Sequence, residues 1–367
     1  MIYLDNAATS LIKPVGVENA VVNAMRSMAS PGRGAHAPAM RAAETVFECR
    51  EAAARLFKVA DAENVVFTMN ATHALNIAIR SVVKPGSRVL VSGFEHNSVT
   101  RPLRMLTDDI TVAGSRLFDE ENTLSEFDEK LRRADAVVCT HVSNAFGYIL
   151  PVYEIAALCR RAGVPLIVDA SQSAGVLDVD FARLGAAFVA MPGHKGLFGP
   201  QGTGILLCGA DALPLMSGGS GSDSISQTMP DYLPDRLEAG TLNVPGYAGL
   251  TEGLRFVRRT GVENIFRRAH RQLERCAEGL QKLGMEVFAG AHQASTVSFR
   301  PAMDCEEAAA FLAKQGIAVR AGLHCAPFAH ESAGTLESGT VRVSFGHDAS
   351  DAQTDAFLRV VSKLPRV

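Results

Sequence analysis

The sequence lacks the features that mark nucleic-acid-binding, membrane-spanning or exported proteins. It contains no block of basic residues and its formal net charge is −3, which argues against nucleic acid or an anionic membrane as the main partner. No apolar run approaches the roughly 20 residues needed to span a bilayer. The first ten residues, MIYLDNAATS, lack the charged start and apolar core of a signal peptide. We therefore expect a cytoplasmic protein whose ligands are small molecules.

A cysteine framework is also missing. The seven cysteines are odd in number, scattered and without CxxC pairing, so neither a disulfide scaffold nor a zinc site is predicted. We expect each thiol to be reduced. The chain contains no internal repeat or low-complexity tract.

What the sequence does contain is an alternation of buried strands and amphipathic helices. Five short apolar runs predict strands, at 64–69, 88–92, 136–140, 165–170 and 187–190. Helices are predicted at 72–83 and at 152–162, the second of which ends at Gly163. Such alternation implies crossover connections, hence a largely parallel sheet in an α/β fold with ligands at the carboxyl ends of the strands.

The length of 367 residues, 47% of them hydrophobic, exceeds one typical domain. The pattern changes near Gly246, after which Phe266 and Leu283 bound the apolar face of a long helix that Gly284 ends. An α+β unit is predicted from strands at 294–299, 317–320 and 340–345 and a helix at 306–314. We expect a large domain over 14–246 and a small domain built from 1–13 and 247–367.

Lys195 stands out as a candidate reactive amine. It lies in AMPGHKG, residues 190–196, between an apolar run and a second glycine-rich turn, GPQGTG. A lysine buried in such a loop loses hydration, and burial lowers its pKa toward the nucleophilic range. The alternative is an ordinary exposed loop lysine.

Polar residues follow the predicted strands at the same edge of the sheet. Asp169 closes the run PLIVD, where a carboxylate needs a cationic partner, and a protonated pyridine nitrogen of pyridoxal phosphate would suit it. The alternative is a helix N-cap. Gln172, three residues on, can reach the phenolic oxygen of that cofactor or be a plain loop residue.

Three further junctions point to the same crevice. The segment 70–73, NATH, offers a helix N-terminus and the Thr72 hydroxyl to a phosphate, although a capping threonine without a ligand is a common feature. His96 follows the run RVLVS and can lie over a pyridine ring or be a loop histidine. Asn144 follows AVVCT in the same manner.

In this order the motifs resemble a class V, fold-type-I pyridoxal-phosphate enzyme, specifically a cysteine desulfurase of the sulfur-mobilisation (SUF) type within the cysteine desulfurase and selenocysteine lyase family. The resemblance runs nearly end to end. It rests on YLDNAAT at 3–9, ATHALN at 71–76, EHNS at 95–98, SNAFG at 143–147, VDASQSAG at 168–175, GHKGLFGPQGTGIL at 193–206, EAGTLN at 238–243, RAGLHCA at 320–326 and RVSF at 342–345.

The resemblance implies a mostly parallel seven-stranded sheet between helices, with a small α+β C-terminal domain. It implies that Lys195 carries the cofactor, that Asp169 pairs with the pyridine nitrogen, that Gln172 bonds the phenolic oxygen and that His96 stacks on the ring. It further implies phosphate contacts from the N–H of Ala71, from Thr72 and from His194, and from Thr241 of a neighbouring subunit, hence a homodimer with shared active sites. Pro192 stands where the family usually has a serine, which removes one phosphate donor.

Cys325, in RAGLHCAP, separates the sulfur-transferring enzymes from aminotransferases on this fold. A lone cysteine is usually a small core residue. Here Gly322 and Pro327 favour a loop, His324 can polarise the thiol, and Arg320 adds positive potential that favours the thiolate. The short loop resembles the RxGxHCA group, whose members rely on a docked acceptor protein to take the sulfur.

Arg342, on the predicted strand TVRVSF, is the candidate for the substrate carboxylate, because a guanidinium binds a carboxylate through two parallel hydrogen bonds. The alternative is a salt bridge on a strand. Asn144 would assist, and Arg320, Ala8 in the YLDNAAT segment and His36 in GRGAHAP resemble further substrate-side residues. We expect SGGSGSDS, at 217–224, to be a mobile loop at the mouth of the site.

The sequence therefore predicts conversion of L-cysteine to L-alanine, with a persulfide left on Cys325 and His96 handling protons near the leaving sulfur. Selenocysteine lyase activity is the nearest alternative, since the same residues would cleave a carbon–selenium bond. A class V aminotransferase would not need Cys325. A non-catalytic scaffold is disfavoured by the presence of both Lys195 and Asp169.

Overall fold

The computed structural model describes residues 1–32 and 34–365. Its main feature is a seven-stranded sheet in the order β2-β8-β7-β6-β5-β3-β4. β8 runs antiparallel to both of its neighbours, and the other pairs are parallel. The strands are β2 Val65–Thr68, β3 Val89–Ser92, β4 Ile110–Ala113, β5 Ala136–Thr140, β6 Leu166–Asp169, β7 Phe188–Pro192 and β8 Gly204–Cys208.

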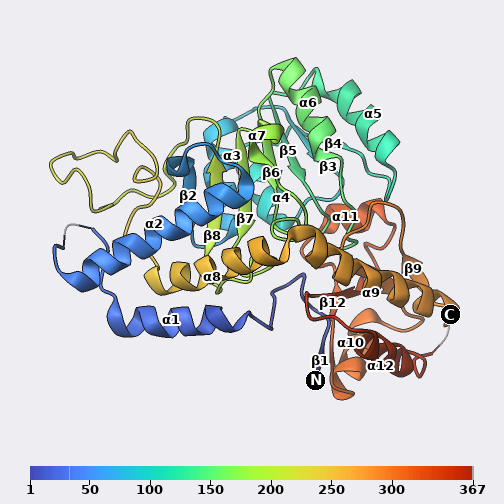
Figure 1. Ribbon diagram of the computed structural model, residues 1–367. Coiled ribbons are helices and arrows are strands. Elements are labelled where there is room, and N and C mark those ends of the chain that lie inside the picture. The colour runs from blue at the N-terminus through green and yellow to red at the C-terminus, as the bar shows by residue number, and fades with distance from the viewer. Residues whose placement is uncertain (33, 366–367) are drawn as a thin grey trace.

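Helices cover both faces of this sheet (Figure 1). Neighbouring side chains of a strand point to opposite faces, so Val137 and Cys139 join one core while Ala136 and Val138 join the other. The first core is closed by α2 Ala37–Phe57, α5 Glu120–Leu131, α6 Val152–Ala162, α7 Phe181–Leu184 and α8 Val244–Thr260. The second is closed by α3 Ala71–Val82 and α4 Asn97–Arg104. A mostly parallel sheet between helices, as expected for the fold class, is thus confirmed.

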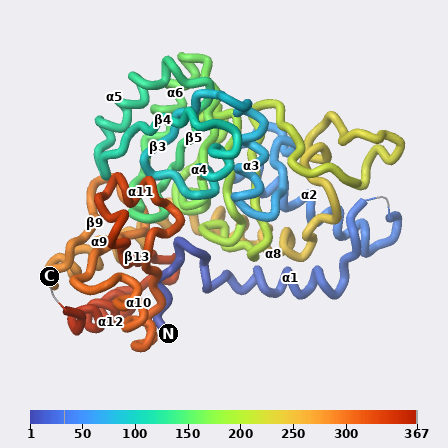
Figure 2. The backbone as a smooth tube through the Cα atoms, turned by 180° about the vertical axis from the view of Figure 1, so that it is seen from behind, coloured from blue at the N-terminus to red at the C-terminus, as the bar shows by residue number. Residues whose placement is uncertain are grey.

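A second, smaller layer contains the C-terminal part of the chain. Its antiparallel sheet has the order β12-β13-β10-β9, and a parallel pair joins β1 near the N-terminus to β11. The strands are β1 Ile2–Tyr3, β9 Glu286–Phe288, β10 Thr296–Arg300, β11 Ile317–Ala318, β12 Arg320–Gly322 and β13 Thr340–Ser344. The helices are α9 Val262–Lys282, α10 Cys305–Lys314, α11 Pro327–Ser332 and α12 Asp351–Val361. Both views place the N-terminus beside this layer (Figures 1 and 2).

The domain boundary predicted at Gly246 stays a prediction, and one predicted strand differs from the structure. Gly246 lies inside α8, which packs on α1 Val15–Ser27 and on α2, and its Leu250 and Leu254 belong to the core of the large sheet. The packing partners change at Gly261, between α8 and α9, so we propose the domain boundary there. The strand predicted at 317–320 is two strands in two sheets, because β11 pairs with β1 whereas β12 pairs with β13.

The long connection from 209 to 243 has neither helix nor strand, and Figure 1 shows it extending away from the sheet. It includes the segment 217–224, which is exposed for most of its length. None of the described helices is long and apolar enough to cross a membrane.

Candidate active site

A cavity of about 510 Å³ lies at the carboxyl ends of the parallel strands. It gathers eight of the predicted site residues, contributed by five separate strand-to-loop junctions. Its lining is Asn70, Ala71, Thr72, His96, Ser98, Thr140, Val142, Asn144, Asp169, Ser171, Gln172, Pro192, His194 and Lys195.

Lys195 lies in the loop that follows β7, and its side chain is half-buried. Burial lowers the pKa of its amine to about 8, the positive charges of Arg342 and Arg320 act in the same direction, and Asp169 opposes them. A fraction of the amine is therefore unprotonated near neutral pH, as a nucleophile or base requires.

The N-terminal segment holds this loop in place. The backbone carbonyl of His194 accepts hydrogen bonds from Ser10 Oγ at 3.0 Å, Thr9 Oγ1 at 3.2 Å and Lys13 Nζ at 2.9 Å. The N–H of Ser10 donates to the same oxygen at 3.2 Å, and Lys13 Nζ also lies 2.7 Å from Ser10 Oγ. Burial lowers the pKa of Lys13 to about 8. The residues that precede α1 thus fix the backbone beside Lys195.

Asp169 ends β6 and is 3% exposed, with Oδ1 accepting a hydrogen bond from the N–H of Ser171 at 2.9 Å. Gln172 Nε2 donates to the carbonyl of Ala7 at 2.9 Å. Behind Asp169 lies the buried Glu95, whose Oε1 accepts from the Thr140 N–H and from the Ser92 hydroxyl. Burial raises the pKa of Glu95 to about 8, and the nearby Asp169 adds to the increase. Sequence reasoning missed Glu95.

The part of the cavity lined by Ala71, Thr72 and Ser98 suits an anion. The N–H groups of Ala71 and Thr72 open α3 and have no acceptor within the described residues. Thr72 Oγ1 lies 2.8 Å from Ser98 Oγ, which places two hydroxyls at the cavity. Helix N-termini and hydroxyls of this kind bind phosphate. Sequence reasoning did not single out Ser98, which brings a hydroxyl to the cavity wall that Pro192 also lines.

His96 is the N-cap of α4, and its Nδ1 accepts from the N–H of Ser98 at 3.0 Å. Burial lowers the pKa of its imidazole, although the charge of Asp169 opposes this effect. A neutral ring whose Nδ1 accepts a hydrogen bond carries its proton on Nε2. His194 is also neutral, because burial lowers its pKa to about 4, and its Nδ1 lies 3.0 Å from Thr9 Oγ1.

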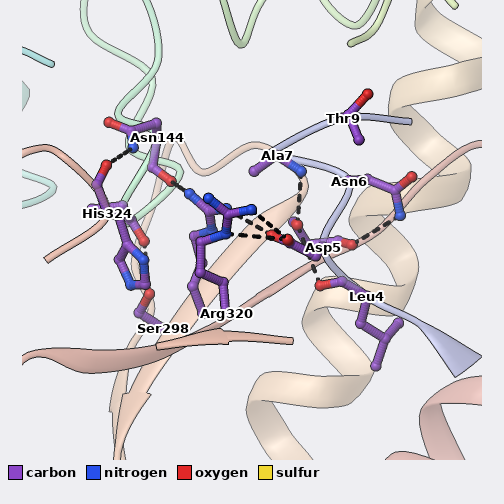
Figure 3. A network of polar contacts seen from close by, with 12 residues as sticks. Leu4, Asp5, Asn6, Ala7, Thr9, Asn144, Ser298, Arg320 and His324 are labelled. Carbon is purple, nitrogen blue, oxygen red and sulfur yellow. Dashed lines mark hydrogen bonds and ion pairs between the residues drawn. The ribbon is translucent and has the colours of Figure 1, made fainter. Parts of the chain in front are cut away.

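The candidate substrate arginines share the carboxylate of Asp5, and Figure 3 shows Asp5 beside Arg320. Arg342 is 2% exposed, and its Nη2 bonds Asp5 Oδ1 at 2.8 Å. Its Nη1 donates to the carbonyl of Asn144 at 3.0 Å. Arg320 binds the other oxygen, Asp5 Oδ2, through Nε and Nη2 at 3.1 Å each. Asn144 Nδ2 in turn donates to the carbonyl of His324 at 2.7 Å.

Cys325 has the one exposed thiol among the seven cysteines, and all seven are free. Both His324 and Cys325 adopt left-handed backbone angles, with φ of 51° and 56°. The turn is held at its two carbonyls, because Asn144 Nδ2 bonds that of His324 and the N–H of Asn97 bonds that of Cys325 at 2.7 Å. These contacts attach the cysteine turn to the large domain beside His96.

The expectation that His324 polarises the thiol is wrong. Its imidazole is buried, with Nε2 3.3 Å from Thr340 Oγ1, and its ring centroid lies 5.4 Å from that of His330. Burial lowers its pKa well below the usual value, so the ring is neutral. The ring therefore lies against Thr340 and His330, while the thiol of Cys325 is exposed.

Six candidate residues are absent from the lining of this cavity: Arg320, Arg342 and Cys325, described above, and His36, Ala8 and Thr241. His36 is exposed and caps α2 by accepting from the N–H of Ala39. Ala8 is half-buried and donates its N–H to the carbonyl of Asp5. Thr241 is exposed in the long connection before α8. Their roles in the site stay predictions.

A sequence profile of the family described as aminotransferase class-V matches residues 2–357. The chain belongs to this family. Similar proteins include a probable cysteine desulfurase of Pyrococcus abyssi (strain GE5 / Orsay), 31% identical over 99% of this chain and 94% of the relative. Another, from Methanothermobacter thermautotrophicus, is 33% identical over 94% of this chain and 89% of the relative. The apo structure of cysteine desulfurase from Thermococcus onnurineus NA1 has a TM-score of 0.91 and 33% identity, covering 99% of this chain and 94% of that one.

Enzymes of this family depend on pyridoxal phosphate, and the cavity fits that group. A half-buried amine with a lowered pKa lies near a buried carboxylate, as the aldehyde and the ring nitrogen of the cofactor require. The unpaired N–H groups that open α3 and the adjoining hydroxyls suit the phosphate.

Proposed function

We propose that this protein is a pyridoxal-phosphate-dependent cysteine desulfurase that converts L-cysteine to L-alanine and retains the sulfur as a persulfide on Cys325. The observation that carries the proposal is the exposed thiol of Cys325, held by Asn97 and Asn144 beside the cavity of Lys195 and Asp169. The curated relatives described above bear the names of cysteine desulfurases.

Pyridoxal phosphate, when bound, acidifies the Cα proton of the substrate by withdrawing electrons. Lys195 would hold the cofactor and, as a free amine, would accept that proton. Asp169 would keep the ring nitrogen protonated, Gln172 and His96 would contact the ring, and Ala71, Thr72 and His194 would hold the phosphate. Arg342 binds the substrate carboxylate with help from Asn144.

Cys325 performs the sulfur transfer. Its thiolate attacks the substrate sulfur, a sulfur–sulfur bond forms, and the carbon–sulfur bond breaks with its electron pair remaining on carbon. The carbon takes up the proton released from the enzyme thiol, with His96 handling protons near the leaving sulfur, and alanine leaves. The sum is L-cysteine plus enzyme thiol giving L-alanine plus enzyme persulfide.

The turn that contains Cys325 is exposed and is held in place by hydrogen bonds. This arrangement favours transfer of the sulfur to an acceptor protein that docks on the enzyme. We also propose a homodimer in which Thr241 reaches the phosphate of the neighbouring site. Exposed apolar side chains on α1 and α2, including Met25 at 71% and Phe47 at 61%, suit such an interface. On the sequence grounds given above, we place the enzyme in the cytoplasm.

The decisive experiment incubates the purified protein with L-cysteine and a reductant and measures alanine and sulfide together. Equal yields support the proposal, and pyruvate would instead indicate β-elimination. Borohydride reduction and peptide mapping should place the cofactor on Lys195. Cys325→Ala should abolish activity on L-cysteine. Activity on L-selenocysteine that this variant retains, or that the wild type shows exclusively, would favour a selenocysteine lyase.

Dimerisation has a separate test. Lys195→Ala and Thr241→Val chains, each impaired alone, should regain activity when mixed and reassociated, because hybrid dimers contain one site with an intact lysine and an intact partner threonine. A monomeric mass in solution, or no recovery on mixing, would contradict the shared site.

A further inference from the structure

Asp5 has a place in the site that the reaction outlined above does not use. It is 8% exposed, and its two carboxylate oxygens bind different arginines, Oδ1 facing Arg342 and Oδ2 facing Arg320. Figure 3 shows Asp5, on the N-terminal segment, facing Arg320. One negative charge is therefore shared by two positive charges, which leaves a net charge of +1 in the cluster.

Arg342 retains capacity for a second anion. Its Nε is buried and has no hydrogen-bond partner within the described residues. A buried donor without an acceptor is costly, so an incoming carboxylate would be stabilised there. Arg320 is more exposed than Arg342, since 51% of its side chain is accessible to solvent. Its Nε and Nη2 both bind the same oxygen of Asp5.

The charge of the cluster reaches the reactive lysine. The pKa of Lys195, lowered first by burial, is lowered further by Arg342 and Arg320 and raised by Asp5. Any change in the balance between these three residues is thus expected to alter the electrostatic potential where the substrate binds.

We infer that Asp5 is a specificity-determining residue: by occupying Arg320 and half of Arg342, it leaves a site of net charge +1 that accepts amino acids with one carboxylate and a neutral side chain. Without Asp5 the cluster would have a charge of +2 and a free second guanidinium, which would favour amino acids with an anionic side chain. This inference rests on the proposed function, because it takes Arg342 as the binder of the substrate carboxylate.

The experiment compares dissociation constants of the holoenzyme for L-alanine and L-aspartate, measured from the change in cofactor absorbance on titration. Asp5→Asn should bind L-aspartate about tenfold or more tightly relative to L-alanine than the wild type does. Arg320→Gln, which lowers the cluster charge to zero, should weaken L-alanine binding by about tenfold. The double variant D5N/R320Q restores the charge of +1 and should restore the wild-type preference.

Asp5→Glu and Arg320→Lys keep the charges and serve as matched controls. If Asp5 only orients Arg342, Asp5→Asn will weaken both ligands equally and Arg320→Gln will not repair the loss, which overturns the inference. An unchanged ratio in Asp5→Asn also overturns it. Should Asp5→Asn fail to fold, the exposed position of Arg320 still allows the Arg320→Gln comparison to decide. Wild-type production of alanine and sulfide tests the proposed function independently of these ratios.

Discussion

Glu238→Gln is expected to be among the most destabilising substitutions in the chain. Glu238 forms a two-pronged ion pair with Arg50, with both N–O distances 2.8 Å and side-chain exposures of only 4% and 9%. Its Oε1 also accepts from the N–H of Phe67 at 2.6 Å, and the Arg50 guanidinium lies 4.5 Å from the Phe67 ring centroid. Glutamine keeps the shape but leaves Arg50 as a buried charge without a counterion.

Breaking a buried ion pair by neutralising one partner costs about 3–5 kcal/mol. The pair joins α2 to the start of the segment 238–243, so Glu238→Gln should lower the free energy of unfolding by that amount. Urea denaturation of the cofactor-free protein, followed by circular dichroism, measures the change. The matched variant R50M/E238Q removes the unpaired charge while the glutamine oxygen still accepts from Phe67, so its loss should be smaller.

A loss below about 1 kcal/mol in Glu238→Gln would refute the reasoning, because it would mean that the pair is solvated or relaxes freely. A double variant less stable than Glu238→Gln would refute it as well. The same loop contains Thr241, so a drop in cofactor affinity in Glu238→Gln would indicate that the pair also places this residue.

Three further outcomes follow from the site. Ser98→Ala should weaken pyridoxal phosphate binding by about tenfold if its hydroxyl joins Thr72 at the phosphate, and an unchanged dissociation constant would contradict this. The pKa of Glu95 is raised from 4.5 to about 8, so its contribution to stability is complete below pH 4.5 and is lost as the pH rises through 8. Glu95→Gln should therefore gain stability relative to the wild type as the pH rises. Parallel plots of unfolding free energy against pH for the two proteins would contradict this prediction. If Lys13 positions Lys195 through the carbonyl of His194, Lys13→Met should lower kcat more than it changes KM and should shift the pH dependence of the cofactor absorbance. Lys13→Arg should restore part of both effects. A loss of thermal stability alone would show that Lys13 has no such positioning role.

The large sheet was predictable from sequence because its central strands are continuous apolar runs. All five predicted strands of the large domain are present within a few residues, and α6 has the predicted bounds. β4 escaped detection because it is a four-residue edge strand with only one buried residue. β8 escaped because it starts at Gly204, the last residue of the glycine-rich segment GPQGTG, which is typical of a loop. The break between β11 and β12 has no marker, since a strand changes partners there without a glycine or proline.

Much of the site was predictable for one geometric reason. Carboxyl ends of parallel strands meet at one edge, so Asp169, His96 and Lys195, which follow three different strands, had to converge. The burial of the His324 ring was not predictable, because a left-handed backbone at a residue other than glycine has no marker in the sequence. Asp5 and Lys13 were missed because their partners are Arg342 and the carbonyl of His194, 337 and 181 residues away in sequence.

These contacts were missed for one reason, which is that they join residues far apart in the sequence, and a local sequence pattern does not reveal them. A sequence motif identifies a group that can react, but the charge state of that group depends on the total charge that the fold brings near it. Lys195 illustrates the point, since its pKa responds to Asp169 from β6, to Arg342 from β13 and to Asp5 from the N-terminal segment. The same segment binds the loop of Lys195 through Ser10. Substitutions within residues 5–13 should therefore change the chemistry of the site, although none of these residues needs to touch the reacting atoms.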